Sequence, residues 1–354
     1  MSEAKGKNEN RVWLTAGTLV RNYKIDARIA ASGMGEIYRA VNRSSKQVVA
    51  LKILPAPPHC KAEQLEALAQ QMNQQALPSH PAICETYEVG VTETGKLFIA
   101  TEYVIGQSLD TLLAAKSHLD VVKFAEQTAA ALQAAHESGL IHGDLKMSNV
   151  MLTVDGKVKL LDLGLMKYQQ LWQRSEEDQR PSSVRHLAPE QVNARPVTPL
   201  SDLFSLGALL YELVTGVAPF AGETPLQVCA AIVWNKPQPI AELVDGVAAE
   251  FAESIATLLE KDPSQRPPSA AAFLSEVRQQ LVRHTPPPKY FGTAMFQAGQ
   301  RFIGTEDGQM VAGFGKGALQ FVFHDGAGWV VFGLSVLVAC YALVSFLTLI
   351  GVKH

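Results

Sequence analysis

The sequence predicts an α+β fold in which a small β-rich lobe precedes a larger helical lobe, followed by one C-terminal transmembrane helix. Three observations support this. Short apolar, β-branched runs such as VVALKIL (residues 48–54) alternate with turn signals in the first third of the chain. From Leu109 onward the apolar residues recur at helical spacing. Residues 329–352 form an uncharged apolar run that is long enough to cross a bilayer.

Composition limits the classes of function. The chain has 354 residues, which suffices for one large domain or two ordinary ones. Its net charge of −3 gives no strong basic field, so we predict no nucleic-acid partner. The four cysteines are scattered, without a C-x-x-C pair or a His/Cys cluster. Reduced, structural thiols in a cytosolic domain are therefore favoured over a zinc site.

The N-terminal part reads as a flexible tail followed by a β-rich lobe. Residues 1–18 begin with a polar, charged stretch that lacks the apolar region of a signal peptide. The main domain is predicted at 19–284. Its first lobe combines strands at 48–54 and 96–104 with one helix at 63–77, a run rich in helix formers.

The second lobe is predicted to be helical. An amphipathic helix over 121–139 ends at Gly139, and a strongly apolar helix over 203–216 ends at Gly216. Two more helices are expected at 248–263 and 268–284. A β-rich lobe before a helical lobe is an α+β layout. The TPPPK run then ends the domain and opens a Pro/Gly-rich juxtamembrane segment, 285–328.

The last segment is predicted to span a membrane. At 1.5 Å per residue, 329–352 reaches roughly 36 Å, against about 30 Å for the hydrocarbon core. A buried core helix is the alternative, which the length and uniform apolarity of the run disfavour. Trp329 suits one interface, and Lys353 and His354 suit water at the other. We expect a single-pass, tail-anchored membrane protein.

The residues that carry chemistry lie in two neighbouring motifs. LIHGDLKMSNVML (140–152) holds Asp144, Lys146 and Asn149, and VKLLDLGL follows with Asp162. An Asp can take a hydroxyl proton, and a Lys can steady a transferring phosphoryl group. An Asn and a second Asp can hold a divalent metal. Together they form a set suited to phosphoryl transfer.

With these motifs in place, the chain resembles the eukaryotic-like Ser/Thr protein kinases of bacteria over about 20–284. VALK, ATEYV, APE, SDLFSLGALLYELVTGVAPF and KDPSQRP occur in the family's order. The resemblance implies the bilobal protein-kinase fold, ATP and Mg²⁺ as cofactors, and protein Ser/Thr hydroxyls as substrates. A domain that uses ATP and keeps its cysteines reduced would face the cytoplasm.

The resemblance also implies site roles. Lys52 would hold the α- and β-phosphates, Asp144 would be the catalytic base, and Lys146 would contact the phosphate. Asn149 and Asp162 would bind magnesium. Asp202 would support the catalytic loop, and Arg266 would pair with Glu190. Thr101 would be the gatekeeper, with the backbone of Glu102 and Val104 facing adenine. The full set expected to bind the nucleotide is Ile29, Gly33, Gly35, Ile37, Ala50, Lys52, Thr101, Glu102, Val104 and Leu152.

The phosphate-covering loop departs from the family pattern. In IAASGMGEIYRA (29–40), G-x-G-x-x-G falls on Ala30, Ser32 and Gly35. An added side chain limits positive φ and close backbone approach to an anion. Gly33 and Gly35 remain, so we predict weakened rather than lost phosphate binding.

The helix after Lys52 departs as well. The family places a glutamate there to hold the lysine, and counting back from SHPAIC puts that position at Gln70 or Gln71. Glu63 or Glu66 could substitute if the register slips, and the unaligned count could itself be misplaced. A true loss would remove a charge-assisted hydrogen bond of about 1.5–3 kcal/mol, or about ten- to a hundredfold in rate.

The catalytic loop has one departure of its own, because Gly143 stands where many kinases carry an arginine that pairs with an activation-segment phosphate. Phosphorylation of that segment should therefore matter less. Ser183 falls at the family's Thr position.

We predict a membrane-anchored Ser/Thr kinase, with activity reduced by these departures. The alternative is a pseudokinase that binds nucleotide or serves as a scaffold at the membrane. A small-molecule phosphotransferase is disfavoured, since the APE and Arg266 elements belong to protein kinases. The sequence does not identify the protein substrate, and a homodimer is a candidate assembly.

Overall fold

The computed structural model describes most of the main domain. The described residues are 14–32, 35–57, 60–75, 77–115, 117, 119–166, 168, 184–283, 303–304 and 310–311. The chain divides into two compact units, 1–292 and 293–354. In the second unit, β10 (Ile303–Gly304) pairs antiparallel with β11 (Met310–Val311).

The transmembrane prediction falls outside the described residues, as does most of the juxtamembrane segment. Among the helices that the structure does describe, none is long and apolar enough to span a membrane. The anchor at 329–352 therefore stays a prediction.

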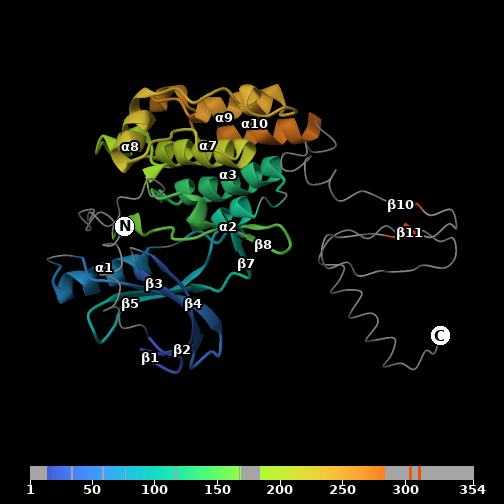
Figure 1. Cartoon of the computed structure of the whole chain (residues 1–354). Coiled ribbons are helices and arrows are strands. Elements are labelled where there is room, and N and C mark those ends of the chain that lie inside the picture. The colour runs from blue at the N-terminus through green and yellow to red at the C-terminus, as the bar shows by residue number, and fades with distance from the viewer. Residues whose placement is uncertain are drawn as a thin grey trace, which may run out of the picture. The chain divides into compact units, whose positions relative to one another are not determined.

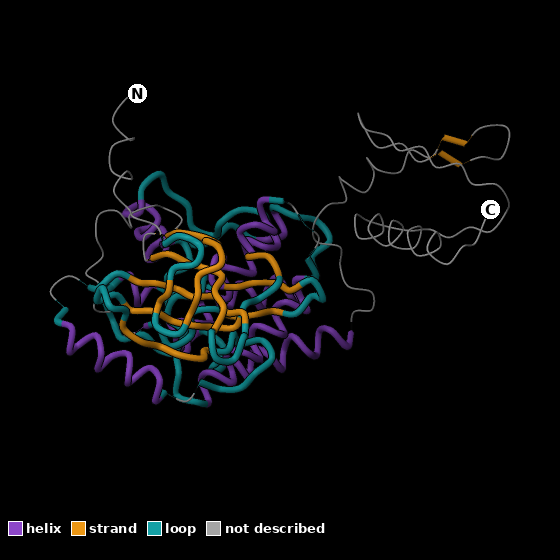
Figure 2. The backbone as a smooth tube through the Cα atoms, turned by 90° about the horizontal axis from the view of Figure 1, so that it is seen from below, coloured by secondary structure: helices purple, strands orange, loops and turns teal. Residues whose placement is uncertain are grey.

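The first lobe is a six-stranded antiparallel sheet with strand order β1-β2-β3-β4-β6-β5 (Figure 1). Helix α1 (Ala62–Gln74) packs on it, mainly against β5. Seen from below in Figure 2, the strands of the sheet lie in front of the helices of the second lobe. The strands are β1 (Leu19–Val20), β2 (Tyr23–Ser32), β3 (Gly35–Asn42), β4 (Val48–Leu54), β5 (Thr86–Val91) and β6 (Leu97–Glu102).

The period-2 alternation of β3 and β4 places apolar side chains on the two faces of this sheet. Tyr38 and Leu51 belong to a core cluster on one face. A second cluster joins Leu65 and Leu68 of α1 to Ile99 of β6. Burial of both faces holds the sheet and α1 as one lobe.

The second lobe is mainly helical, and a three-stranded sheet lies at its start (Figure 1). That sheet has the order β7 (Gly106–Ser108), β8 (Val150–Thr153), β9 (Val158–Leu160). The α-helices are α2 (Leu109–Ala114), α3 (Val121–Glu137), α6 (Pro189–Val192), α7 (Pro199–Thr215), α8 (Pro225–Trp234), α9 (Ala249–Leu258) and α10 (Ala270–Arg283). Short 3₁₀ turns cover Met147–Asn149, Ile240–Glu242 and Pro263–Gln265.

Helix α7 is the centre of this lobe, because every residue from Ser201 to Val214 is buried. It ends at Gly216, whose φ of +76° is the left-handed conformation that favours glycine at a helix C-terminus. Gly207 permits close packing, since a Cβ there would lie 2.6 Å from Cβ of Leu258 on α9. The predicted bilobal α+β layout is confirmed.

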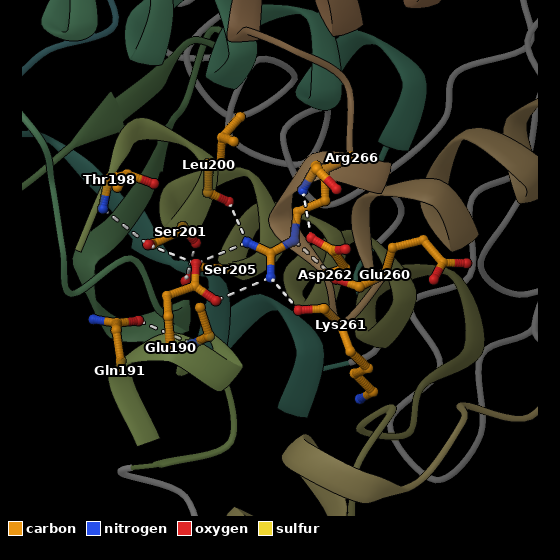
Figure 3. Close-up of polar contacts among 12 residues, drawn as sticks. Glu190, Gln191, Thr198, Leu200, Ser201, Ser205, Glu260, Lys261, Asp262 and Arg266 are labelled. Atoms are coloured by element: carbon orange, nitrogen blue, oxygen red, sulfur yellow. Dashed lines mark hydrogen bonds and ion pairs between the residues drawn. The ribbon is translucent and has the colours of Figure 1, made fainter. Parts of the chain in front are cut away.

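A buried ion pair ties the start of α6 to the turn after α9 (Figure 3). Arg266 Nη1 and Nη2 donate to the two carboxylate oxygens of Glu190, at 2.8 and 3.0 Å. Nη1 also donates to the Leu200 carbonyl, and Ser201 Oγ donates to Glu190. Burial alone would raise the pKa of Glu190, but the Arg266 and Ser201 hydrogen bonds outweigh it and lower the pKa. The predicted pairing of these two residues is present, with both groups fully engaged.

We expect Arg266→Ala to lower the free energy of unfolding by about 3–5 kcal/mol, because it leaves the Glu190 carboxylate buried without its partner. The matched control is Arg278→Ala, which removes a surface pair with Glu126 (3.0 Å, Arg278 side chain 58% exposed) and should cost under about 1 kcal/mol. Urea unfolding of both variants checks this. Equal losses would contradict the structural role given to Arg266.

Candidate active site

The catalytic-loop motif folds into a tight polar cluster between α3 and β8. Lys146 Nζ lies 2.6 Å from Asp144 Oδ2. Asn149 Nδ2 donates to the Asp144 carbonyl at 2.9 Å and to its Oδ2 at 3.1 Å. Asn149 is placed by the 3₁₀ turn that leads into β8. Three residues predicted from the sequence to act together are thus in direct contact.

Asp202 of α7 holds the backbone of this loop from behind. Its Oδ2 accepts from the His142 N–H and its Oδ1 from the Gly143 N–H, both at 2.8 Å. Nε2 of His136 lies 2.9 Å from Oδ2. The Asp202 side chain is only 1% exposed. The supporting role expected for Asp202 therefore has a direct geometric basis.

Gly143 fits its place for two reasons. Its φ of +71° is left-handed, and a Cβ would lie 2.9 Å from the Met166 sulfur. Its carbonyl accepts from Gln191 Nε2 at 2.7 Å. Ser183, the residue expected at the family's Thr position, lies outside the described residues.

Lys52 and Asp162 form the second polar contact of the site. Nζ of Lys52 lies 2.5 Å from Oδ2 of Asp162, and the two side chains are 12% and 16% exposed. Burial alone would raise the pKa of Asp162, but the charge and hydrogen bond of Lys52 outweigh it and lower the pKa. Asp162 has a φ of +63°, which is uncommon outside glycine. This pair links β4 of the first lobe to the loop after β9 of the second.

A cavity of about 820 Å³ lies between the two lobes. Among the sequence-predicted site residues, those that line it are Ile29, Ile37, Ala50, Lys52, Thr101, Glu102, Val104, Lys146, Asn149 and Asp162. Asp144 does not line it directly but touches Lys146 and Asn149, which do. Gly33 lies outside the described residues. The structure therefore gathers most of the predicted nucleotide set around one space.

Leu152 is not part of that lining, and Met151 takes its place. The reason is strand geometry, because successive side chains of β8 point to opposite faces. Leu152 packs instead against the core of the helical lobe. The alternation of side chains along the VMLT strand is the sequence signal that assigns Met151 to the cavity and Leu152 to the core.

Two further features concern the predicted adenine site. The Glu102 side chain pairs with Lys159 at 2.7 Å, and the Glu102 N–H donates to the Glu85 carbonyl at 2.8 Å. The Glu102 carbonyl contacts the Cys84 thiol at 3.6 Å. Burial raises the pKa of the Cys84 thiol to about 12, so it stays protonated. The wall of the cavity here is thus an ordered, uncharged thiol beside a paired carboxylate.

The β2–β3 hairpin accommodates its non-glycine residues without strain. Ala30 pairs with Ile37 and Ser32 with Gly35 in the antiparallel ladder, and neither Ala30 nor Ser32 has a positive φ. Gly35 does require glycine, since its φ is +145° and a Cβ would lie 2.3 Å from the Ile53 carbonyl oxygen. In this conformation the backbone restriction expected from Ala30 and Ser32 has no effect, because both positions are extended.

Helix α1 gives Lys52 no acidic partner in the part of the chain that the structure describes. Gln70 and Gln71 are exposed, and so are Glu63 and Glu66. The ion pair that Lys52 does form is with Asp162. Leu65, Leu68 and Ala69 fix which face of α1 is buried, so the proposed slip of register that would bring in a glutamate is not observed.

Comparison with known proteins agrees with this geometry. The protein kinase domain model matches residues 23–278. The chain is 29% identical over 296 residues to the serine/threonine-protein kinase PknA of Mycobacterium tuberculosis, covering 80% of this chain and 68% of the relative. It is 30% identical over 279 residues to serine/threonine-protein kinase pkn3 of Myxococcus xanthus, covering 74% of this chain and half of that protein. The crystal structure of the M. tuberculosis PknI kinase domain matches with a TM-score of 0.60 at 22% identity, over 76% of this chain and all of the other. This chain belongs to the protein kinase domain family, and the two relatives named above are described as serine/threonine-protein kinases.

Replacing Lys52 by Met should lower the free energy of unfolding by about 3 kcal/mol at pH 7, because Asp162 is left buried without its cation. In the wild type the lowered pKa of Asp162 adds stability above its unfolded pKa, and that stability is lost as the pH falls. In the variant, burial acts without the cation and raises the pKa of Asp162, so the contribution of Asp162 to stability increases as the pH falls. Urea unfolding at pH 7 and pH 4 should therefore show a smaller difference between the two proteins at pH 4. An unchanged difference would contradict the Lys52–Asp162 pairing.

Proposed function

We propose that this chain transfers the γ-phosphoryl group of ATP to Ser or Thr hydroxyls of proteins, at a rate lowered by the missing acid on α1. One observation carries the proposal. Lys52, Lys146, Asn149 and Asp162 line a single cavity, and Asp144 contacts two of them. The family supports ATP and Mg²⁺ as cofactors in general. The relatives' names support the Ser/Thr class.

The donor set suits magnesium. Nδ2 of Asn149 is used in hydrogen bonds to Asp144, which leaves its Oδ1 to bind a metal. Asp162 pairs with Lys52 through Oδ2, and its lowered pKa keeps it ionised. A carbonyl oxygen and a carboxylate are the hard ligands that Mg²⁺ prefers. When bound, the ion would neutralise charge on the phosphates.

The chain's own residues would then divide the reaction between them. Asp144 would accept the proton of the attacking hydroxyl, and the hydroxyl oxygen would form a bond to phosphorus as the bond to the ADP oxygen breaks. Lys146, held 2.6 Å from Asp144, would stabilise the negative charge on the moving phosphoryl group. Lys52 would hold the remaining phosphates against β4.

Asp144→Asn should lower phosphoryl transfer by about 10²- to 10⁴-fold, because the amide cannot accept the proton. The full-length protein, purified in detergent, is incubated with magnesium and labelled ATP, and transfer to itself and to a generic basic protein is measured. The matched control is Asp155→Asn, an exposed aspartate paired with Lys157, which should leave transfer unchanged. Unchanged transfer by Asp144→Asn would show that Asp144 is not the group that accepts the proton. Nucleotide binding without any transfer by the wild type would favour the pseudokinase alternative.

Gln71→Glu should raise the rate by up to about tenfold by supplying Lys52 with a charge-assisted hydrogen bond. Met72 lines the cavity, and Gln71 lies about 100° from it around the helix, whereas Gln70 lies about 160° away. Gln70→Glu is therefore the matched control and should have no effect. A gain with Gln70→Glu alone, or with neither variant, would contradict the account of the missing acid.

We further propose that the apolar run 329–352 anchors the protein in a membrane with the kinase domain in the cytoplasm. The run's length and lack of charge support this. Extraction of cell membranes with alkaline carbonate tests it: the protein should stay in the pellet and should move to the supernatant when 329–352 is deleted. Release of the full-length protein would contradict the anchor.

A further inference from the structure

The cavity also has charged side chains that the proposed transfer step does not use. Asp110 at the start of α2, together with Arg185 and His186 before α6, lines the same space as Lys146. The pKa of Asp110 is raised mainly by burial, and the charges of His186, Glu212, Arg185 and Lys146 also act on it. Because Asp110, Arg185 and His186 share a cavity with Lys146, which contacts Asp144, a protein segment whose hydroxyl faces Asp144 would lie beside them.

Glu212 lies behind this group on α7, with both carboxylate oxygens engaged. Arg185 Nη1 lies 2.7 Å from its Oε1, and His186 Nε2 lies 3.0 Å from its Oε2. The Glu212 side chain is 4% exposed. Burial alone would raise the pKa of Glu212, but His186 and Arg185 outweigh it and lower the pKa, so the carboxylate is ionised. A lysine or arginine of a substrate would meet a carboxylate that is already occupied.

Arg185 is the group that this arrangement leaves for a substrate. Its side chain is 33% exposed, compared with 5% for His186. The three nitrogens of a guanidinium carry five N–H groups in a planar fork. In Arg185, the nitrogen that donates to Glu212 is Nη1. The remaining donors suit a carboxylate, which arginine binds with two parallel hydrogen bonds. Asp110 lines the same cavity, and its negative charge disfavours an acidic substrate side chain there.

We propose that Arg185 determines substrate specificity by closing Glu212 to basic side chains and selecting protein segments with an acidic side chain near the accepting Ser or Thr. The inference rests on the proposed protein kinase function and specifies its substrate class.

The test uses synthetic peptides with one central Ser, in which each flanking position in turn carries Asp, Arg or Ala. With the full-length protein, kcat/KM should be about tenfold higher for Asp than for Arg at one or more positions. Arg185→Gln should remove that preference and raise the use of Arg peptides, since Glu212 then has a free oxygen. Adding Glu212→Gln to Arg185→Gln should abolish the gain for Arg.

Three controls assign the effect to the right residue. Arg195→Gln removes an exposed arginine of the same lobe and should leave the Asp-to-Arg ratio unchanged. Asp110→Asn should strengthen the preference for Asp by removing the opposing charge. Arg185→Lys keeps the charge but loses the planar fork and should give an intermediate ratio.

A wild-type preference for Arg at every position, or a ratio that Arg185→Gln does not change, would overturn the proposal. Failure to phosphorylate any peptide, together with absent autophosphorylation, would count against the proposed function instead. In that case the same peptides, labelled with a fluorophore, test Arg185 by binding. Tighter binding of Asp peptides that is lost in Arg185→Gln would support the role of Arg185, and equal binding of Asp and Arg peptides would overturn it.

Discussion

The buried carboxylate of Asp202 is the constraint on which the rest of the site depends. It lies on α7, the helix around which the second lobe packs, and accepts hydrogen bonds from two successive backbone N–H groups at His142 and Gly143. Those bonds fix the path of the loop and thereby the position of Asp144. A carboxylate held inside a hydrophobic core is costly unless its oxygens are hydrogen-bonded, and here both are. The stability of the core and the geometry of the chemistry are thus coupled at one residue.

The second requirement is a connection between the lobes, which the Lys52–Asp162 pair provides. In this structure the lysine is held from the second lobe and not from α1. Asp162 keeps a left-handed backbone conformation that its neighbours must maintain. The pair is therefore both a structural link and part of the site, and any nucleotide that uses Lys52 has to compete with Asp162 for it. That competition would weaken the contact between Lys52 and the phosphates, in addition to any effect of the absent α1 glutamate.

Sequence patterns predicted the lobes, the long buried helix and the polar residues of the site, because apolar periodicity and motif order reflect local geometry. Errors arose where one residue of register decides the outcome, as with Leu152 and Met151 on opposite faces of β8. Ala30 was expected to restrict the hairpin, but whether a methyl group matters depends on φ, which the sequence does not give. Arg185 was missed because its partner Glu212 lies 27 residues away, on α7.

We propose that Asp162 and its partners form a working magnesium–nucleotide site despite the altered loop and α1. Isothermal titration of the full-length protein with ATP, with and without magnesium, tests this most directly. We expect binding that requires magnesium in the wild type and a loss of that requirement in Asp162→Asn. Equal binding with and without magnesium in the wild type, or no binding at all, would contradict it.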